Sequence, residues 1–376
     1  MKEGHPILQF GTSRFLQAHV DLFVSEAAER GEALGGITVV QSTRSPASTM
    51  RTQALARVEG FDVVVRGLSG GQPVETRKTC RSVREAFQAA DDWAAVRARI
   101  RGPVQVIVSN TGDGGWALAP QDDAALLAEE APAPVSFPAK LLVLLHDRWR
   151  AQPHAELTLL PCELVSRNGD TLRDLVVGLA RQWQCAPAFV DWLQTQPVWA
   201  NSLVDRIVSE ALEPVGAVAE PYALWAIEAQ ARLQLPCRHP DIVVTDDLAG
   251  YERLKLFLLN LGHTLLAERW LSGRHAVDMT VLQAMQEPTL KDPLEQAWQH
   301  EVLPVFDALG QGEAARAYLV ELRSRLLNPF LAHRLADIAQ NHALKKARRL
   351  QPVVDLALEH VPGLPQPRLR AALANH

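Results

Sequence analysis

The stretch Ile7-Leu8-Gln9-Phe10-Gly11 is a short apolar run that stops at a glycine. Apolar side chains then recur at helical spacing between Phe15 and Ala27. The next apolar run, Ile37–Gln41, is rich in β-branched residues and follows two glycines, which is typical of a strand. The order strand, tight turn, helix, strand predicts one βαβ unit.

Alternation of helical and strand-like segments continues through the first two thirds of the chain. A helix-like stretch, Val83–Ile100, precedes the apolar strand Val104–Val108, and an amphipathic helix, Lys140–Arg150, precedes the strand Leu157–Leu160. Such alternation favours a parallel sheet that is covered on both faces. We therefore predict an α/β fold, with a Rossmann-like, doubly wound and mainly parallel sheet domain in residues 1–246 and a mostly α-helical C-terminal domain in residues 247–376.

Composition excludes several classes of protein. The 376 residues carry 38 Lys and Arg against 43 Asp and Glu, a formal net charge of −5, so no general attraction to nucleic acid or to an anionic membrane is expected. The 4 cysteines are widely spaced, which argues against a disulfide scaffold and against structural zinc. No apolar run approaches the ~20 residues of a membrane span. We expect a cytoplasmic protein with no nucleic-acid or membrane partner.

The turn after the first strand keeps part of a dinucleotide-binding pattern. Gly11 occupies its first glycine position, but Ser13 and Leu16 occupy the other two. The turn is therefore either a dinucleotide site or an ordinary strand-to-helix turn capped by Ser13. The second strand ends without a carboxylate to bind the ribose of NAD. Arg44, just beyond this strand, either binds the extra phosphate of NADP or is solvated. NAD is therefore expected, and NADP stays open. The candidate cofactor-binding residues are Gly11, Thr12, Ser13, Arg14, Phe15, Thr43, Arg44 and, at the carboxyl end of a central strand, Ser109, Asn110 and Thr111.

A second candidate site lies in the helical part. Lys255 and His263 are eight positions apart, which places them within about 80° of one another on one side of a helix. Both side chains then face one cleft, or else the helix is buried with a satisfied histidine; spacing leaves both interpretations open.

Several motifs occur in a fixed order along nearly the whole chain, and as an ordered set they are specific. The motifs are Phe10–His19, Ser109-Asn110-Thr111, Pro161-Cys162-Glu163-Leu164, Asn168-Gly169, Val204–Val208, Lys255–His263 and the late segment from Asn328 to Pro352. Together they resemble the polyol-specific long-chain dehydrogenases, the family of mannitol dehydrogenase, and among its branches they are most similar to the tagaturonate (altronate) reductases.

The resemblance implies roles for individual residues. Lys255 corresponds to the general acid/base, Asn168 and Asn260 to amide donors for the reacting oxygen, and His263 to a partner of a substrate hydroxyl. Asp205 corresponds to a carboxylate that binds substrate hydroxyls, although an ion pair or a strand-end cap explains it equally well. The lysine and the two amides replace a metal, so no metal is expected.

Substrate class depends on a basic cluster near the end of the chain. Lys345 and Arg349 lie four apart on one predicted helix face, where they are suited to bind a carboxylate, or form a solvated face. The first interpretation favours an NAD(P)-dependent oxidoreductase that interconverts a keto-sugar acid and its aldonate, of the tagaturonate/altronate type. The alternatives are a dehydrogenase of a neutral sugar alcohol, such as mannitol or arabinitol, one of a hexitol phosphate, and a non-catalytic dinucleotide-binding protein.

Overall fold

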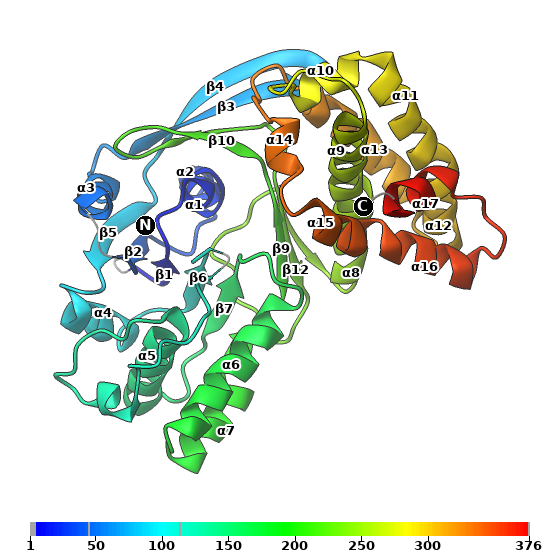
Figure 1. The fold of residues 1–376 in the computed structure, drawn as a ribbon. Coiled ribbons are helices and arrows are strands. Elements are labelled where there is room, and N and C mark those ends of the chain that lie inside the picture. The colour runs from blue at the N-terminus through cyan, green and yellow to red at the C-terminus, as the bar shows by residue number, and fades with distance from the viewer. Residues whose placement is uncertain (1–4, 44–45, 113, 375–376) are drawn as a thin grey trace. The chain divides into compact units, whose positions relative to one another are not determined.

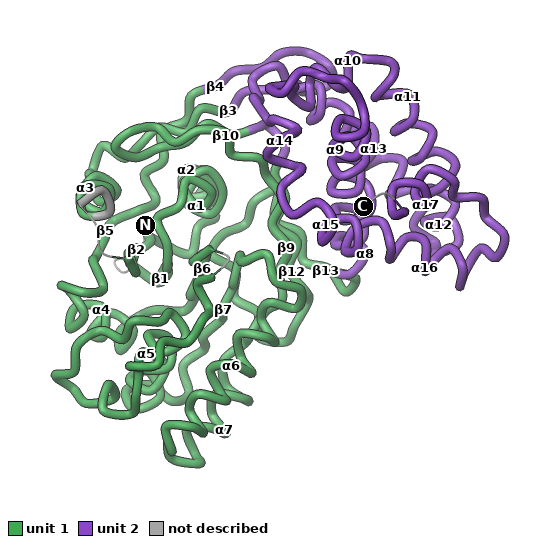
Figure 2. Tube along the Cα trace, in the orientation of Figure 1, with its two compact units in different colours: residues 1–64, 77–219, 223–248 green, residues 65–76, 220–222, 249–376 purple. Residues whose placement is uncertain are grey.

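The computed structural model describes residues 5–43, 46–112 and 114–374. Within it the chain forms two compact units (Figure 2). Unit 1 consists of Met1–Val64, Arg77–Ala219 and Ala223–Leu248, and unit 2 of Val65–Thr76, Glu220–Tyr222 and Ala249–His376.

A six-stranded sheet organises unit 1 (Figure 1). The strand order is β5-β2-β1-β6-β7-β8, and every neighbouring pair is parallel. The order reverses between β1 and β6, which makes that position the topological switch point, where open α/β sheets bind ligands at the carboxyl ends of their strands. The predicted Rossmann-like, doubly wound sheet is confirmed. The strands are β1 (Ile7–Phe10), β2 (Ile37–Gln41), β5 (Val83–Gln88), β6 (Val106–Ser109), β7 (Thr158–Pro161) and β8 (Val198–Trp199).

Helices bury the sheet because their apolar faces pack on its strands. Leu8, Ile107 and Leu159 of the sheet share one core with residues such as Leu142 and Val176 of the helices. The central strands are buried along their whole length, which explains their continuous apolar runs. The helices are α1 (Arg14–Leu16), η1 (Gln17–Asp21), α2 (Leu22–Glu29), α3 (Pro46–Leu55), α4 (Trp93–Ile100), η2 (Ala124–Leu127), α5 (Phe137–Ala151), α6 (Asn168–Gln182) and α7 (Pro187–Thr195).

One predicted element is wrong. The stretch Val83–Ile100 is not a single helix: Val83–Gln88 forms the edge strand β5, and only Trp93–Ile100 forms the helix α4. The first half pairs in parallel with β2, and that pairing outweighs a local pattern that suits a helix. Two smaller sheets also escaped the sequence analysis. Their orders are β10-β11-β3-β4 and β13-β12-β9, with β3 (Phe61–Ser69), β4 (Gln72–Cys80), β9 (Ser202–Asp205), β10 (Val208–Ala211), β11 (Ala217–Ala219), β12 (Leu224–Glu228) and β13 (Ile242–Thr245).

Unit 2 is helical apart from the outer part of the β3–β4 hairpin, and beyond β13 the described residues contain no strand. Leu258, Leu266, Trp298, Phe306 and Leu322 lie in its single core. Among the described residues no helix is both long and apolar enough to span a membrane. The helices are α8 (Leu248–Leu254), η3 (Lys255–Asn260), α9 (Leu261–Ser272), α10 (Val281–Gln286), α11 (Pro288–Ala297), η4 (Trp298–Val302), α12 (Leu303–Ala308), α13 (Gly312–Leu326), α14 (Leu335–Ile338), α15 (His342–Arg349), α16 (Gln351–His360) and α17 (Pro367–Ala374).

A buried ion pair holds the short segment Glu220–Tyr222 against α13. Arg325 donates from Nε and Nη2 to the two carboxylate oxygens of Glu220, at 3.0 and 2.9 Å, and both side chains are at most 2% exposed. The Arg325 guanidinium also lies over the Tyr222 ring, 4.1 Å from its centroid. Two-point geometry of this kind compensates the loss of hydration better than a single contact does.

Replacement of Glu220 by Ala leaves the Arg325 charge buried without its carboxylate. We expect this variant to lose about 3–5 kcal/mol of unfolding free energy, measured by urea denaturation. Asp307→Ala is the matched control, because Asp307 makes the same two-point pair with Arg316 on the surface. Equal losses in the two variants would contradict the structural importance of the buried pair.

Candidate active site

The turn between β1 and α1 requires a glycine. Gly11 has φ +114°, and a Cβ atom there would lie 2.5 Å from the carbonyl oxygen of Asn110. Its N–H donates to the Val40 carbonyl at 3.1 Å, and Asn110 N–H donates to the Phe10 carbonyl at 3.0 Å. The ends of β1, β2 and β6 are therefore drawn together at the switch point.

The remaining candidate residues of this turn order the start of the helix. Ser13 is the N-cap of α1, since its hydroxyl accepts from the Leu16 N–H at 3.2 Å. The Thr12 hydroxyl donates to the side-chain oxygen of Gln41, whose amide nitrogen donates to the Thr43 hydroxyl at 2.5 Å. The turn is thus both capped as an ordinary helix start and placed where a dinucleotide binds.

Two aromatic or charged neighbours of the turn have protein partners. Arg14 donates to the Ser209 carbonyl at 3.2 Å, and Phe15 stacks on His19 with 4.8 Å between ring centroids. His19 is fully buried, and burial lowers its pKa to about 3, so the ring is neutral. Arg44 lies outside the described residues.

Glu163 is a residue of this edge for which the sequence analysis assigned no role. One oxygen of its carboxylate accepts from the Ser109 hydroxyl at 2.9 Å, and the other from the N–H and hydroxyl of Thr111 at 3.0 Å each. The Asn110 amide donates to the Cys162 carbonyl at 3.0 Å. A buried carboxylate with three donors holds the end of β6 against the end of β7. The signal was present in the sequence, because Glu163 lies two residues after the end of β7, and Ser109-Asn110-Thr111 lies at the end of its neighbour β6.

Asn168, at the first position of α6, is engaged at both ends of its amide. Its nitrogen lies 2.9, 3.2 and 2.9 Å from the carbonyl oxygens of Pro161, Glu163 and Ser202. Its oxygen accepts from the N–H groups of Gly169 and Ser202 at 3.0 and 2.8 Å. The side chain is 1% exposed, so in this structure its N–H groups point at the main chain and it ties the β7–α6 loop to β9.

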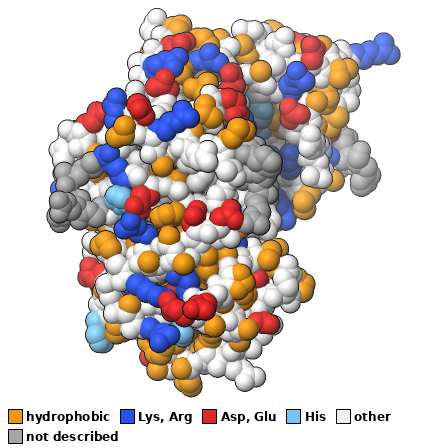
Figure 3. Space-filling model, turned by 90° about the vertical axis from the view of Figure 1, so that its left-hand side faces the viewer, with side chains coloured by type: hydrophobic (Ala, Val, Ile, Leu, Met, Phe, Trp, Pro, Cys, Tyr) orange, Lys and Arg blue, Asp and Glu red, His pale blue; other side chains and the backbone are white. Residues whose placement is uncertain are grey.

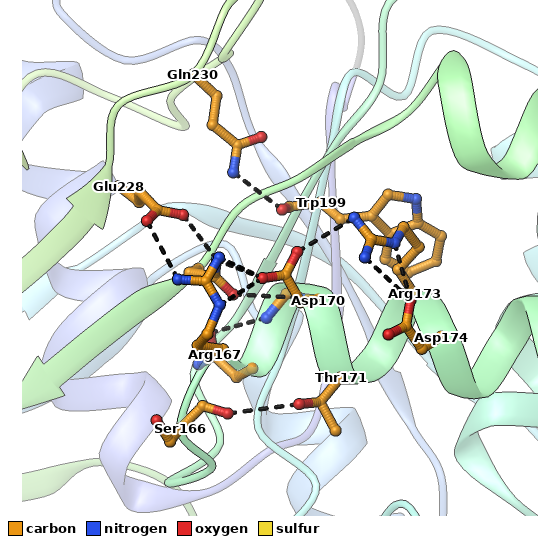
Figure 4. Close-up of polar contacts among 12 residues, drawn as sticks. Ser166, Arg167, Asp170, Thr171, Arg173, Asp174, Trp199, Glu228 and Gln230 are labelled. Carbon is orange, nitrogen blue, oxygen red and sulfur yellow. Dashed lines mark hydrogen bonds and ion pairs between the residues drawn. The ribbon is translucent and has the colours of Figure 1, made fainter. Parts of the chain in front are cut away.

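An ion-pair network covers the start of α6 (Figure 4). Arg167 has the left-handed φ of +47°, and its guanidinium lies between the carboxylates of Asp170 and Glu228, at 2.5 and 3.6 Å. Asn201 donates to the same two carboxylates, at 3.2 and 2.7 Å. This network joins the start of α6 to Glu228 at the end of β12.

Asp205 lies at the end of β9, opposite Leu224 of β12, and is 4% exposed. Its carboxylate is close enough to His19 to raise that pKa slightly against the dominant effect of burial. Whether it binds substrate hydroxyls stays a prediction.

Three candidate residues of unit 2, Lys255, Asn260 and His263, lie on one continuous helix whose geometry differs from a regular α-helix. Residues Lys255–Asn260 form a π-helical segment, and the Leu261 N–H bonds back to the Leu256 carbonyl, five residues earlier. In an α-helix five positions rotate a side chain to about 140° away, whereas an i→i+5 turn brings residue 260 back over residue 255. Asn260 and His263 are then i,i+3 neighbours. The π segment therefore places Lys255, Asn260 and His263 on one face.

Packing around this helix is close. A Cβ atom on Gly262 would lie 2.6 Å from the Trp298 ring, whose indole N–H donates to the Leu258 carbonyl at 3.2 Å. His263 meets His333 edge to face, with 4.9 Å between ring centroids. Burial lowers the pKa of His333, so that ring favours its neutral form.

The basic cluster of α15 lies against this same segment. Arg349 Nη1 is 3.2 Å from the Thr264 hydroxyl and 3.5 Å from the Asn260 carbonyl, and Lys345 donates to the Ile338 carbonyl at 2.8 Å. Burial lowers the pKa of both Lys345 and Arg349, and for Lys345 the nearby Arg349 charge adds to the effect. The structure thus places Arg349 beside Asn260 and Thr264, and Lys345 within electrostatic range of Arg349 and of His333, the ring that meets His263.

The candidate residues therefore form two groups, one at the switch point of unit 1 and one on η3, α9 and α15 of unit 2. Among the residues that the structure describes, no three His, Cys, Asp or Glu side chains are arranged to hold a metal ion.

Comparison with known proteins identifies the family. Residues 5–236 match the model of the mannitol dehydrogenase Rossmann domain, and residues 247–374 match the model of the mannitol dehydrogenase C-terminal domain. The chain belongs to the mannitol dehydrogenase family. The family likeness extends over both units, and the resemblance inferred from the ordered motifs is confirmed.

Similar relatives include proteins named altronate oxidoreductase. The one from Yersinia enterocolitica is 32% identical over 99% of this chain and 79% of its own length, and the one from Klebsiella pneumoniae strain 342 is 31% identical over 98% and 78%. Among solved structures, a D-sorbitol dehydrogenase in substrate-free form has a TM-score of 0.78 at 20% identity, covering 95% of this chain and 76% of that one. A Pseudomonas fluorescens mannitol 2-dehydrogenase, in a ternary complex with NAD and D-mannitol, has a TM-score of 0.77 at 18% identity, covering 99% and 79%. These structures share the fold of this family member.

From the hydrogen bonds of Asn168 we predict how stability depends on pH when this residue is replaced. In Asn168→Asp the new carboxylate faces three carbonyl oxygens, which raises its pKa in the folded state above the unfolded value of about 3.9. Stability is then greatest below that unfolded value and falls as pH rises, because the unfolded chain ionises first. We expect the unfolding free energy of Asn168→Asp to drop relative to the unsubstituted protein between about pH 4 and about pH 7.

Asn168→Ala is the control, since it removes the same hydrogen bonds but adds no titrating group. Its loss of stability, measured by the same denaturation series, is expected to be independent of pH. A pH-independent difference between the Asp and Ala variants would show that the amide is not enclosed by carbonyl groups.

Proposed function

We propose that this protein is an NAD(P)-dependent oxidoreductase that interconverts a keto-sugar acid and its aldonate, of the tagaturonate/altronate type. The observation that carries the proposal is the position of Arg349, whose half-buried cation lies beside Asn260 and Thr264, with the half-buried Lys345 close to it. Cations that burial disfavours are stabilised by an anionic ligand, and a sugar acid supplies one. The relatives named altronate oxidoreductase agree with this substrate class.

Residues 1–246 are proposed to bind the dinucleotide at the switch point. Its position supports such a role, because the turn follows β1 at the switch point and α1 begins directly after it with Ser13 as its cap. Gly11, Thr12, Ser13, Arg14 and Phe15 form the turn, and Ser109, Asn110 and Thr111, held by Glu163, form the neighbouring strand end. Thr43 and Arg44 follow β2, where the neutral Gln41 side chain stands in place of a ribose-binding carboxylate, so NAD is proposed and NADP is an outcome of the test.

Residues 247–376 are proposed to supply the chemistry. NAD(P), when bound, accepts or gives the hydride. Lys255 removes the hydroxyl proton during oxidation and returns it during reduction. The amide of Asn260 donates to the oxygen as it gains negative charge; within the described part of the chain this side chain makes no hydrogen bond of its own. His263 binds a second hydroxyl of the substrate.

The two remaining candidates have supporting roles in this proposal. Asp205 accepts hydrogen bonds from substrate hydroxyls. Asn168 acts on the reacting oxygen only if it exchanges one of its carbonyl partners for substrate, and otherwise it positions the β7–α6 loop.

A neutral sugar alcohol is the second candidate substrate. The observation in its favour is that Arg349 and Lys345 already have protein acceptors, namely Thr264 and the carbonyls of Asn260 and Ile338. In that case the cations stabilise α15 against α9 and do not contact substrate.

Lys255→Met removes the proton carrier and keeps the length of the side chain. We expect turnover to fall by about 10²- to 10⁴-fold, with binding of the coenzyme retained, as measured by absorbance and fluorescence of the reduced nicotinamide. Lys291→Met, on α11, is the control and is expected to keep full turnover. Activity of Lys255→Met within a few-fold of the original protein would remove Lys255 from the mechanism.

Arg349→Met separates the two substrate classes. Initial rates of NADH and NADPH oxidation are measured with tagaturonate, fructuronate and fructose. If the guanidinium binds a carboxylate, kcat/KM for the accepted uronate falls by about 10- to 100-fold, mainly through KM, while any rate with fructose changes little. Arg348→Met, on the exposed side of the same helix, is the matched control. Turnover of fructose alone, or equal losses for both substrates, would favour the neutral sugar alcohol.

A further inference from the structure

A cavity of about 650 Å³ lies on unit 2, among α9, α11 and α17, and the proposed function makes no use of it. Leu265, Leu290 and Leu294 form much of its wall, and Arg269 and Arg368 lie at its polar side. Its size is within the range of small-molecule sites, and a mostly apolar lining with a few polar groups is typical of them. The surface is therefore shaped for a ligand and not only for solvent.

The cavity is separate from the candidate catalytic face. Measured around the axis of α9 from His263, the lining residues Leu265, Glu268, Arg269 and Ser272 lie between about 140° and about 240° away. The helix thus presents His263 on one side and the cavity wall on the other.

Arg269 and Arg368 are the cations in the lining of the cavity, and Glu268 is its carboxylate. Glu268 is balanced by Lys346, whose Nζ is 3.2 Å from its carboxylate, and Arg368 is balanced by Glu301 at 3.1 Å. His275 lies 3.7 Å from Glu287. Arg269 is exposed and has no ion pair with any of the residues described, so its guanidinium is available to an anion. The first turn of α11, which includes Thr289 and Leu290, adds the partial positive charge of a helix N-terminus.

We infer that this cavity binds a small organic anion with an apolar body, such as a medium-chain carboxylate. The acidic group pairs with Arg269, with Arg368 on the facing wall, and the apolar body lies on the leucines of α9 and α11. This site goes beyond the proposed function and does not depend on it, because no residue of the coenzyme or sugar site lines the cavity.

Anilinonaphthalene sulfonate, which joins one sulfonate to an apolar aromatic body, is a suitable fluorescent probe. The full chain is titrated with the probe in the presence of saturating NAD, so that probe bound at the dinucleotide turn is displaced. We expect the remaining fluorescence to be displaced by hexanoate but not by hexanol or hexylamine.

Two variants locate the site. Ala371 is exposed at the rim, so Ala371→Trp fills the cavity without entering the core and is expected to abolish the bound fluorescence. Arg269→Gln is expected to weaken the affinity for the probe by about tenfold, the value of one charge-assisted hydrogen bond. Arg274→Gln is the matched control, because Arg274 is an exposed arginine of the next loop that does not line the cavity.

Thermal unfolding of each variant shows whether it is folded before binding is compared. Unchanged probe binding in folded Ala371→Trp would overturn the assignment of the cavity. Unchanged affinity in Arg269→Gln, or equal displacement by hexanol, would overturn the choice of an anion. Loss of the probe on addition of NAD would place it at the dinucleotide turn and would also overturn the proposal.

Discussion

The approach of the Gly11 backbone to the Asn110 carbonyl is the constraint on which the arrangement of unit 1 depends. It is possible only because residue 11 has no Cβ, and it fixes how near the ends of β1 and β6 come to each other at the switch point. Glu163 then binds the end of β6 from the side of β7, and Asn168 extends the connection to β9. Four strands are thus joined by a few buried polar contacts, so the missing glycines of the fingerprint do not prevent a defined turn.

Much of the fold follows from the sequence because its apolar runs are long and regular. The strands at Ile7 and Ile37 and the helix at Lys140 are where the pattern places them, since their apolar residues form long buried runs. Val83–Gln88 is different: it is a strand because β2 offers an open edge, and a contact between segments more than 40 residues apart leaves no local signal.

The candidate sites show a similar limit. Residue identity and spacing select Lys255, Asn260 and His263 as candidates. The π segment explains why Lys255 and Asn260 share a face of the helix. A regular period of 3.6 residues per turn does not predict that shared face. For Asn168 the family resemblance implies an amide donor to the reacting oxygen. In this structure its amide nitrogen instead contacts main-chain carbonyl oxygens. Glu163 is part of a motif that the sequence shows, but its role becomes clear only from its hydrogen bonds to Ser109 and Thr111 at the end of β6.

Charge on the surface has no single dominant sign, and on the face drawn in Figure 3 acidic and basic side chains are interspersed. The basic cluster of α15 is distinctive because several of its cations are partly or fully buried, not because of its net charge. Arg349 and Lys345 contact η3, α9 and α14 on one side of α15, while Lys346 and His342 of the same helix bind Glu268 of α9. Glu268 also lines the cavity behind α9. Helix α15 is thus attached to α9 at two positions one turn apart, because Arg349 contacts Thr264 while Lys346 and His342 contact Glu268.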